Sequence, residues 1–526
     1  MTEKSMSQAA SPQYTSECPA HLYRATDVRE LDRVAIQEQG IPGFTLMSRA
    51  GAAAFALLLE RWPQARKITL FCGVGNNGGD GYVIAALAQQ AGLQPQVIQV
   101  GDAGKSQSDA LTALQQAQKA GVPFQPFAPA AIDTLLADSH VIVDALLGTG
   151  LSGPVRPDYA LAIDAINRSD LPVLAVDIPS GLCADTGAIL GNAVRAAATI
   201  TFIGMKQGLL TGEAPACTGA LFFAGLDVPA IVYRAVPPSA SLVRQDLVKE
   251  WLPPRSRIAH KGSNGHVLII GGDTGMGGAV AMAAEAAGRV GAGLVSVVTR
   301  PEHIAPVLAR RPECMVTSQT DLGPLLQKAT VIVIGPGLGQ QEWGQSLLRQ
   351  ALASPLPLVV DADGLNLLAR WHEQGDALAR RGNWVITPHP GEAARLLRAP
   401  IANEGLLHSS TAQIQRNRFD TVRTLQQQYA AVAVLKGTGS LIAGADDRIW
   451  LSNTGNPGMA SGGMGDVLSG VIGGLIAQGL TLEQAAAAGV WMHGAAADKA
   501  AAQGGERGLL ATDLMSWLRL LANGSG

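Results

Sequence analysis

The chain has 526 residues, of which 62 are glycines, and only 15% of its residues are charged. A formal net charge of −3 at pH 7 gives no sign of a surface that binds a polyanion, so we expect no nucleic-acid partner. The five cysteines show no CxxC or Cys/His ligand spacing, which favours a reducing cytoplasm over a disulfide framework or a structural zinc. We find neither a signal peptide nor an apolar stretch suited to crossing a bilayer, so we expect no membrane association.

Aliphatic runs alternate with helix-length segments in two successive series, which predicts an α/β protein built on two mostly parallel sheets. Residues 1–20 are polar, and we expect them to be mobile. A first domain is predicted over residues 21–235 and a second over residues 246–526. The proline-rich stretch between them, residues 236–245, is the predicted linker.

In the first half, a predicted strand ends at the sequence GVGNNGGDG, residues 73–81, and a helix follows it. The GxGxxG match within it is a weak signal for a dinucleotide site, and a tight structural turn is the alternative. Asn76, Asn77 and Asp80 add side-chain amides and a carboxylate to the backbone N–H groups of this turn. A purely structural turn does not need that much polar chemistry, so the loop indicates a ligand site.

Polar clusters also follow three later predicted strands, at Asp144, at Asp177 and at Lys206. In open α/β sheets, ligands bind outside the carboxyl ends of the strands, so we expect Asn77, Asp144 and Asp177 to meet at one edge. The alternative is that Asp144 and Asp177 only cap the turns or helices that follow them. Lys206 is a candidate proton donor or phosphate contact.

The sequences NNGGDG, DALLGTGLSGPVRP, DIPSG and TFIGMKQG together resemble the NAD(P)HX epimerase domain, over about residues 20–230. The resemblance implies a Rossmann-like three-layer sandwich that interconverts the R and S forms of hydrated NADH or NADPH. It implies that Asp177 lies beside the altered ring as the catalytic residue, with Lys206 as a helper, and that Asn77, Asp144 and Ser180 hold a potassium ion. The residues implied to bind the hydrated dinucleotide are Asn76, Asn77, Gly78, Gly79, Asp80, Gly148, Thr149, Gly150, Leu151, Ser152, Gly153, Pro154 and Asp177.

The second half has no Walker-type phosphate loop at a strand-to-helix junction. Instead, GGMGD at residues 462–466 precedes an apolar helix predicted over residues 467–480. Glycines at this point expose backbone N–H groups to an anion, and Asp466 could deprotonate a hydroxyl beside a transferred phosphoryl group. The alternative is that Asp466 is a simple N-cap. KGTGS at residues 436–440 is a second candidate phosphate loop.

These loops, with DADGLN at 361–366 and HPGE at 389–392, resemble the ribokinase-like fold and its ADP-dependent NAD(P)HX dehydratase branch, over about residues 245–520. The resemblance implies a three-layer domain, Mg²⁺, and ADP as co-substrate, with Asp466 as the catalytic base. Only Glu392 matches the N-x-x-E motif by which this fold organises Mg²⁺. The implied substrate contacts are Ala279, Gly337, His389 and Asp466, and the implied nucleotide contacts are Lys436, Gly437, Thr438, Gly439, Ser440 and Gly465.

Because both halves point to one damaged metabolite, we predict a bifunctional repair enzyme, both isomerase and hydro-lyase. It would epimerise hydrated NADH and NADPH and dehydrate the S form by phosphorylation and elimination, giving AMP and phosphate. We expect small-molecule substrates and a homo-oligomer. The alternative is a ribokinase-like vitamin or sugar kinase fused to a non-catalytic dinucleotide-binding regulatory domain.

Overall fold

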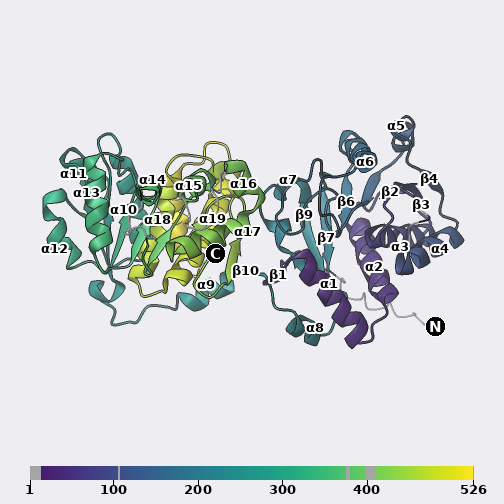
Figure 1. Ribbon diagram of the computed structural model, residues 1–526, viewed down its shortest axis with the longest axis horizontal. Coiled ribbons are helices and arrows are strands. Elements are labelled where there is room, and N and C mark those ends of the chain that lie inside the picture. The colour runs from purple at the N-terminus through teal and green to yellow at the C-terminus, as the bar shows by residue number, and fades with distance from the viewer. Residues whose placement is uncertain (1–13, 103, 105–106, 375–379, 399–409, 525–526) are drawn as a thin grey trace, which may run out of the picture. The chain divides into compact units, whose positions relative to one another are not determined.

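The computed structural model describes residues 14–102, 104, 107–374, 380–398 and 410–524 (Figure 1). The chain forms two compact units that divide between Ala240 and Ser241. Residues 1–13 of the segment expected to be mobile lie outside the described residues. In the rest of that segment, Thr15 is hydrogen-bonded to the first unit. Its N–H donates to the Phe223 carbonyl at 2.9 Å, and its carbonyl accepts from the Phe223 N–H at 2.8 Å.

The first unit is built on a parallel sheet in which the strand order is β4-β3-β2-β5-β6-β7-β9. The order runs outward from β2 in one direction and then outward from β5 in the other, which is the doubly wound Rossmann arrangement. The strands are β2 (Lys67–Cys72), β3 (Gln94–Gln99), β4 (Phe124–Pro126), β5 (Val141–Ala145), β6 (Val173–Val176), β7 (Ala198–Phe202) and β9 (Ala220–Ala224).

Helices cover both faces of this sheet, because successive side chains of each strand point to opposite sides. Leu70 and Cys72 belong to the core under one helical layer, whereas Phe71 belongs to the core under the other. The first layer contains α1 (Ala25–Arg33), α2 (Gly43–Arg61), α3 (Asn76–Gln90) and α4 (Ser108–Lys119), and the second contains α5 (Ile132–Leu136) and α6 (Pro157–Arg168). The predicted Rossmann-like three-layer sandwich is confirmed.

Shorter elements complete the first unit. A two-stranded parallel pair joins β1 (His21–Tyr23) to β8 (Met205–Lys206), and this pairing fixes the start of α1 beside the end of β8. The remaining helices are a π-helical turn at Val34–Glu38, a 3₁₀ turn at Gln207–Leu210, α7 (Pro215–Thr218) and α8 (Ala230–Ala235).

The second unit has its own sheet, in the order β13-β12-β11-β14-β15-β16-β17-β18-β19-β10. Neighbours from β13 to β17 are parallel, β18 is antiparallel to both β17 and β19, and β10 is parallel to β19. The strands are β10 (Ala240–Leu242), β11 (His266–Ile270), β12 (Leu294–Val298), β13 (Met315–Thr317), β14 (Val331–Ile334), β15 (Leu358–Val360), β16 (Trp384–Ile386), β17 (Val432–Leu435), β18 (Ser440–Ala443) and β19 (Ile449–Ser452).

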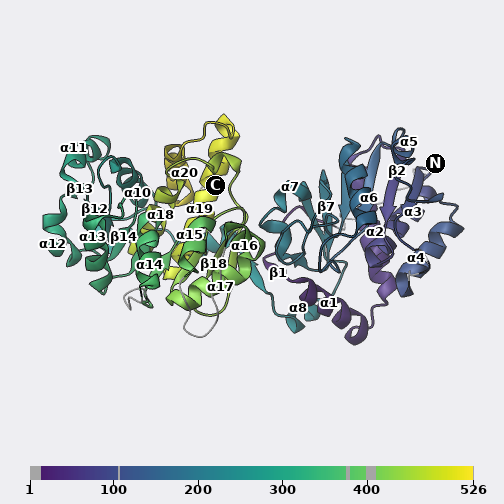
Figure 2. The ribbon, with the colours of Figure 1, turned by 45° about the horizontal axis from the view of Figure 1, so that its top comes forward.

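One face of this second sheet is covered by α10 (Gly277–Arg289), α18 (Met464–Ala477), α19 (Leu482–Gly504) and α20 (Leu514–Leu521). Both views show α18 beside α19 (Figures 1 and 2). The apolar helix predicted over 467–480 is α18, and it is buried in this core as expected. The other helices are α9 (Gln245–Trp251), α11 (Pro301–Arg310), α12 (Leu322–Leu326), α13 (Glu342–Ala353), α14 (Ala362–Glu373), α15 (Pro390–Leu396), α16 (Thr411–Arg416) and α17 (Arg418–Tyr429). Within the described residues, no helix is long and apolar enough to cross a membrane.

Glycine lets α10 and α18 approach each other until their backbones touch. An ideal Cβ at Gly470 would lie 2.2 Å from the carbonyl oxygen of Ala283, whereas a Cβ at Gly288 would meet nothing within 4 Å. We therefore expect Gly470→Ala to lower the free energy of unfolding by about 1–3 kcal/mol, the usual effect of overpacking. Gly288→Ala, in an exposed helical turn, should instead raise it by up to about 1 kcal/mol. Calorimetric unfolding of the full chain measures both changes, and shifts of the same sign would contradict this account.

Candidate active sites

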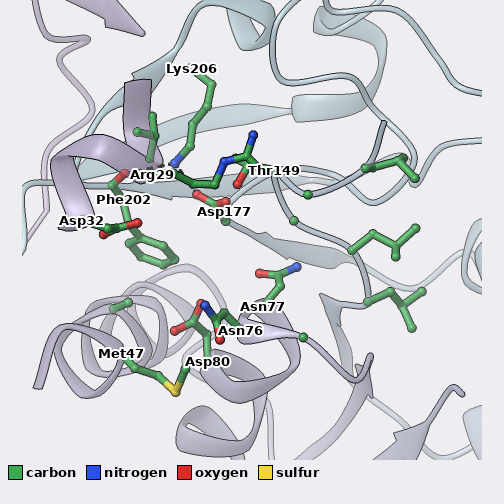
Figure 3. Close-up of a pocket in the computed structure, with 18 of the residues that line it drawn as sticks. Arg29, Asp32, Met47, Asn76, Asn77, Asp80, Thr149, Asp177, Phe202 and Lys206 are labelled. Atoms are coloured by element: carbon green, nitrogen blue, oxygen red, sulfur yellow. Dashed lines mark hydrogen bonds and ion pairs between the residues drawn. The ribbon is translucent and has the colours of Figure 1, made fainter. Parts of the chain in front are cut away.

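The candidate site of the first unit lies where the strand order reverses, between β2 and β5. Gly73 directly follows β2 and lies against the neighbouring strand: its N–H donates to the Ala145 carbonyl at 3.0 Å, and an ideal Cβ there would lie 2.0 Å from the Leu146 oxygen. The segments after the two strands then separate, and a pocket of about 720 Å³ opens between them (Figure 3). This is the place where open α/β sheets bind ligands.

Most of the residues predicted to bind the dinucleotide share this pocket. Its wall includes Asn76, Asn77, Asp80, Gly148, Thr149, Gly150, Leu151, Ser152, Gly153, Pro154, Asp177 and Lys206. Gly78 and Gly79 do not line it. An ideal Cβ at Gly78 would lie 2.0 Å from the Gly73 oxygen, and one at Gly79 would lie 2.7 Å from Cε of Met47. These two glycines therefore allow α3 to pack against its surroundings.

Asp177 follows β6 in a left-handed backbone conformation, with φ of 67°, which is uncommon for residues other than glycine. Its Oδ1 accepts a hydrogen bond from the Nζ of Lys206, which is buried at the end of β8. Lys206 also donates to Thr201 Oγ1 and to the Phe202 carbonyl, each at 3.0 Å, so its three ammonium protons all have acceptors. This arrangement orients Asp177 and leaves its Oδ2 on the side of Gly148.

Two further carboxylates surround the same space as Asp177 (Figure 3). Burial, with a further contribution from Asp177, raises the pKa of Asp32 to about 6 although Lys206 opposes the shift. Burial, and then the charges of Asp177 and Asp32, raise the pKa of Asp80 well above its ordinary value. Asp32 and the adjacent Arg29 come from α1, and sequence reasoning missed both because they belong to an ordinary amphipathic helix without a motif.

Asp144 and Ser180 lie beneath the pocket rather than on its wall. Asp144 accepts hydrogen bonds from the Ser180 N–H at 2.8 Å and the Ser180 hydroxyl at 2.6 Å, and burial raises the pKa of its carboxyl to about 6. The Ser180 hydroxyl in turn accepts from the Leu147 N–H at 2.8 Å. The next residue, Gly148, is close to Asn77, since an ideal Cβ at Gly148 would lie 3.3 Å from the Cβ of Asn77. The structure thus brings Asn77, Asp144 and Ser180 into one neighbourhood.

A pocket of about 460 Å³ forms the candidate site of the second unit. The four residues predicted to contact substrate there, Ala279, Gly337, His389 and Asp466, all line it. They come from the start of α10, the turn after β14, the turn after β16 and the start of α18. Four segments far apart in the sequence therefore meet at the carboxyl ends of the parallel strands.

An ion-pair network of two buried carboxylates and a partly exposed lysine lies beside this pocket. Lys436 Nζ is 2.7 Å from Asp361 Oδ1 and 3.8 Å from Glu392 Oε2. Burial alone would lower the pKa of Lys436, but Asp361 and Glu392 outweigh it and the pKa is raised. Glu392 also accepts from the His389 N–H at 2.8 Å, while His389 Nδ1 accepts from the Gly391 N–H at 3.0 Å. His389 and Glu392 thereby cap α15 together.

Asp466 is in the first turn of α18 and is not its N-cap, a position that Gly463 occupies with φ of 90°. The N-cap alternative for Asp466 is therefore wrong. Burial raises the pKa of Asp466 to about 7, and the nearby carboxylates of Asp361 and Asp363 add to the shift, while Lys436 opposes it. A carboxyl that titrates near neutrality is suited to general base catalysis.

The predicted nucleotide loop, residues 436–440, is held from below by Arg418, which sequence reasoning missed. The guanidinium of Arg418 is buried, and it donates to the carbonyls of Leu435 at 3.3 Å and Gly439 at 3.2 Å. Burial lowers its pKa to about 10. Gly465 contacts the same network, since an ideal Cβ there would lie 3.3 Å from Lys436 Nζ. The loop and the start of α18 are thus side by side, as expected if both contact one nucleotide.

In the described part of the chain, no three His, Cys, Asp or Glu side chains are placed to hold a metal ion. Glu392 is near Lys436 and caps α15, so neither of these roles needs a metal. A Mg²⁺ ion would fit here only with oxygens from nucleotide phosphates, which is how proteins commonly bind it.

Together, the two units define a two-site α/β enzyme, with each site at the carboxyl ends of the strands of its own sheet. Residues 43–208 match the family model of the YjeF-related protein N-terminus, and residues 267–519 match that of NAD(P)H-hydrate dehydratase. The bifunctional NAD(P)H-hydrate repair enzyme of Coxiella burnetii is 51% identical over 505 residues, which cover 95% of this chain and 99% of that protein. The Escherichia coli enzyme of the same name is 44% identical, covering 96% of this chain and 94% of that protein.

Among solved structures, a ribokinase-like superfamily protein from Enterococcus faecalis matches with a TM-score of 0.49 and 29% identity, covering 55% of this chain and 97% of that one. The full-length relatives decide the assignment: the chain belongs to the family of bifunctional NAD(P)H-hydrate repair enzymes. The resemblances of both halves and the predicted function are confirmed, and the alternative of a vitamin or sugar kinase fused to a regulatory domain is not favoured.

Proposed function

We propose that the pocket at Asp177 interconverts the R and S hydrates of NADH and NADPH, and that the pocket at Asp466 dehydrates the S form with an adenine nucleotide. The observation that carries this proposal is that each unit has its own pocket with its own lysine–carboxylate network. The units would be an epimerase domain at 21–235 and a dehydratase domain at 246–526, joined by the linker 236–245. The division between Ala240 and Ser241 supports these boundaries. We also propose a cytoplasmic homo-oligomer.

Epimerisation needs a group that moves a proton at the ring hydroxyl and a site that tolerates positive charge. The hydroxyl is on a carbon next to the ring nitrogen, so its loss as water gives an iminium ion that water can attack from either face. Asp177, with Oδ1 held by Lys206, would use Oδ2 to exchange a proton with this hydroxyl. Asp32 and Asp80 add carboxyl groups to the wall that would face the cation.

Dehydration would begin when Asp466 accepts the proton of the ring hydroxyl. The hydroxyl oxygen would then form a bond to the terminal phosphorus of ADP as the bond to AMP breaks. Loss of phosphate, with a proton from the neighbouring carbon, would restore the ring double bond. The 436–440 loop, braced by Arg418, and Gly465 would position the nucleotide. Mg²⁺ bound with the phosphates would supply charge neutralisation.

A potassium ion fits the donors of Asn77, Asp144 and Ser180. Buried charges in proteins are normally paired or coordinate metals, and the fully buried Asp144 has no salt bridge among the described residues. Asn77 is 7% exposed, and both polar atoms of its amide lack a hydrogen-bond partner within the described chain. An ion there would brace the glycine loop of α3 against the 148–154 segment.

The two activities should separate by mutation, because each pocket draws its side chains from one unit. We expect Asp177→Ala to abolish acceleration of epimer interconversion and to leave nucleotide-dependent conversion of the S hydrate intact. Asp466→Asn should leave epimerisation intact and lower dehydration by about 10²–10⁴-fold, the usual contribution of a general base. NADH absorbance and epimer ratios, followed in a mixture of both hydrates, report the two rates. Loss of both activities in either folded variant would contradict the proposal.

The dehydration rate should rise with pH through about 7. Asp466 must be ionised to accept a proton, and its pKa is raised to about 7, so the active fraction grows as the pH passes that value. Asp363→Asn removes a nearby carboxylate that raises this pKa. The rise should therefore move to lower pH in that variant. Initial rates in saturating substrate test both statements, and an unshifted profile in Asp363→Asn would contradict the assignment of the titration to Asp466.

Thallium(I), a potassium mimic with a strong anomalous signal, tests the cation site. In crystals grown with thallium in place of potassium, we expect an anomalous peak within contact distance of Asn77 Oδ1 and the Asp144 carboxylate. Asp144→Asn keeps the side-chain shape but removes the charge, so the peak should weaken or vanish there. Absence of a peak in the unmodified protein would remove the potassium site while leaving the assignment of Asp177 untouched.

A further inference from the structure

A third pocket, of about 560 Å³, opens on the second unit at the far end of α10 from Ala279. Four arginines line it: Arg289, Arg310, Arg311 and Arg507. It shares no lining residue with the pocket at Asp466, so the proposed reaction does not account for it.

Three of the four arginines are held in place by one buried carboxylate. Glu285, whose side chain is 2% exposed, pairs with Arg310 at 3.1 Å, with Arg289 at 3.5 Å and closely with Arg311. A carboxylate can neutralise one positive charge, so the cluster retains an excess of guanidinium. Because Arg289, Arg310 and Arg311 each use only part of their five donors on Glu285, the rest are oriented in advance for another acceptor.

The rest of the pocket wall points to the same kind of ligand. The Nε of Arg311 is buried and has no hydrogen-bond partner among the described residues. Thr512 and Ser516 contribute hydroxyls, and Ser516 belongs to the first turn of α20, where the helix dipole favours an anion. The second carboxylate of the wall, Asp513, accepts from the Leu510 N–H at 2.9 Å. The wall thus has four guanidinium groups against two carboxylates, both already engaged.

We propose that this pocket is an oxyanion site that binds phosphate, either free or as the phosphate group of a nucleotide. A guanidinium group can donate two parallel hydrogen bonds to two oxygens of one phosphate. In this pocket the acceptor of those bonds would be a bound ligand. The wall from Gly505 to Asp513 also contacts the segment that leads to Asp466: Ser461 Oγ donates to the Leu509 carbonyl at 3.0 Å. Ser461 directly precedes the GGMGD loop, so an anion in this pocket would bind to a wall that is hydrogen-bonded to the start of that loop.

Calorimetric titration of the full chain with phosphate and with pyrophosphate, at constant ionic strength, tests the site. We expect Arg310→Gln/Arg311→Gln to weaken binding by about tenfold or more, since charge-assisted hydrogen bonds are lost. Arg507→Gln leaves the Glu285 pairs intact and should weaken binding too, which guards against an effect of misfolding. Arg519→Gln, an exposed arginine of α20 that does not line the pocket, is the matched control and should bind as the unmodified protein does.

ATP and AMP titrations separate the two sources of phosphate. If the pocket takes nucleotides, the double variant should lose one equivalent of bound ATP and keep the one at the 436–440 loop; if it takes free phosphate, ATP stoichiometry should not change. A tungstate soak should give an anomalous peak among the four arginines. Unchanged phosphate and ATP binding in the double variant would overturn the proposal. It would also be overturned if the only effect of the double substitution were to dissociate an oligomer. Neither result would bear on the reactions proposed for the other two pockets.

Discussion

At each of the two sites one lysine lies among several carboxylates, and the chemistry of both sites depends on how these charged groups are packed together. Lys206 binds Asp177 with Asp32 and Asp80 close by, while Lys436 binds Asp361 with Glu392 close by. One ammonium group can stabilise only one carboxylate fully. The others keep raised pKa values, as Asp32 does in the first unit and Asp466 does in the second. Groups able to move protons near neutral pH are therefore a consequence of burial first and of the neighbouring carboxylates second.

The two sheets determine where these groups meet, and this position could be predicted from the sequence. Parallel strands buried on both faces appear as continuous aliphatic runs, and their carboxyl ends share one edge. Polar residues directly after such runs, such as Asn77, Asp177 and His389, were therefore placed correctly on a pocket. The roles that the resemblances assign to them remain predictions, because geometry alone does not show which group exchanges a proton.

The residues that sequence reasoning missed are on helices, where function leaves no local pattern. Asp32 is in an amphipathic helix, and Arg418 begins a helix that looks like a solvated one, yet both are brought to a site by tertiary packing. Gly78 and Gly79 stay predicted substrate contacts, although neither lines the pocket. Both belong to a ligand-type loop, but their missing side chains make room for the Gly73 backbone and for Met47. A glycine signals a close approach, and the sequence does not say whether a ligand or the protein itself approaches.

Around Glu285 the ratio of charges is reversed, because arginines outnumber carboxylates there. The sign of the excess charge determines which ligands each pocket can accept. Where carboxylates outnumber the lysine, the excess negative charge favours a cationic intermediate or a bound cation and disfavours free phosphate. Where arginines outnumber the carboxylate, the guanidinium donors not used on Glu285 favour an anion. At Asp466 the two tendencies meet: the carboxylate would repel a phosphoryl group, and the N–H groups of the GGMGD turn and Lys436 must compensate. We therefore expect the transferred phosphoryl group at the start of α18, where these donors would offset its charge, with the proposed base Asp466 in the same helical turn.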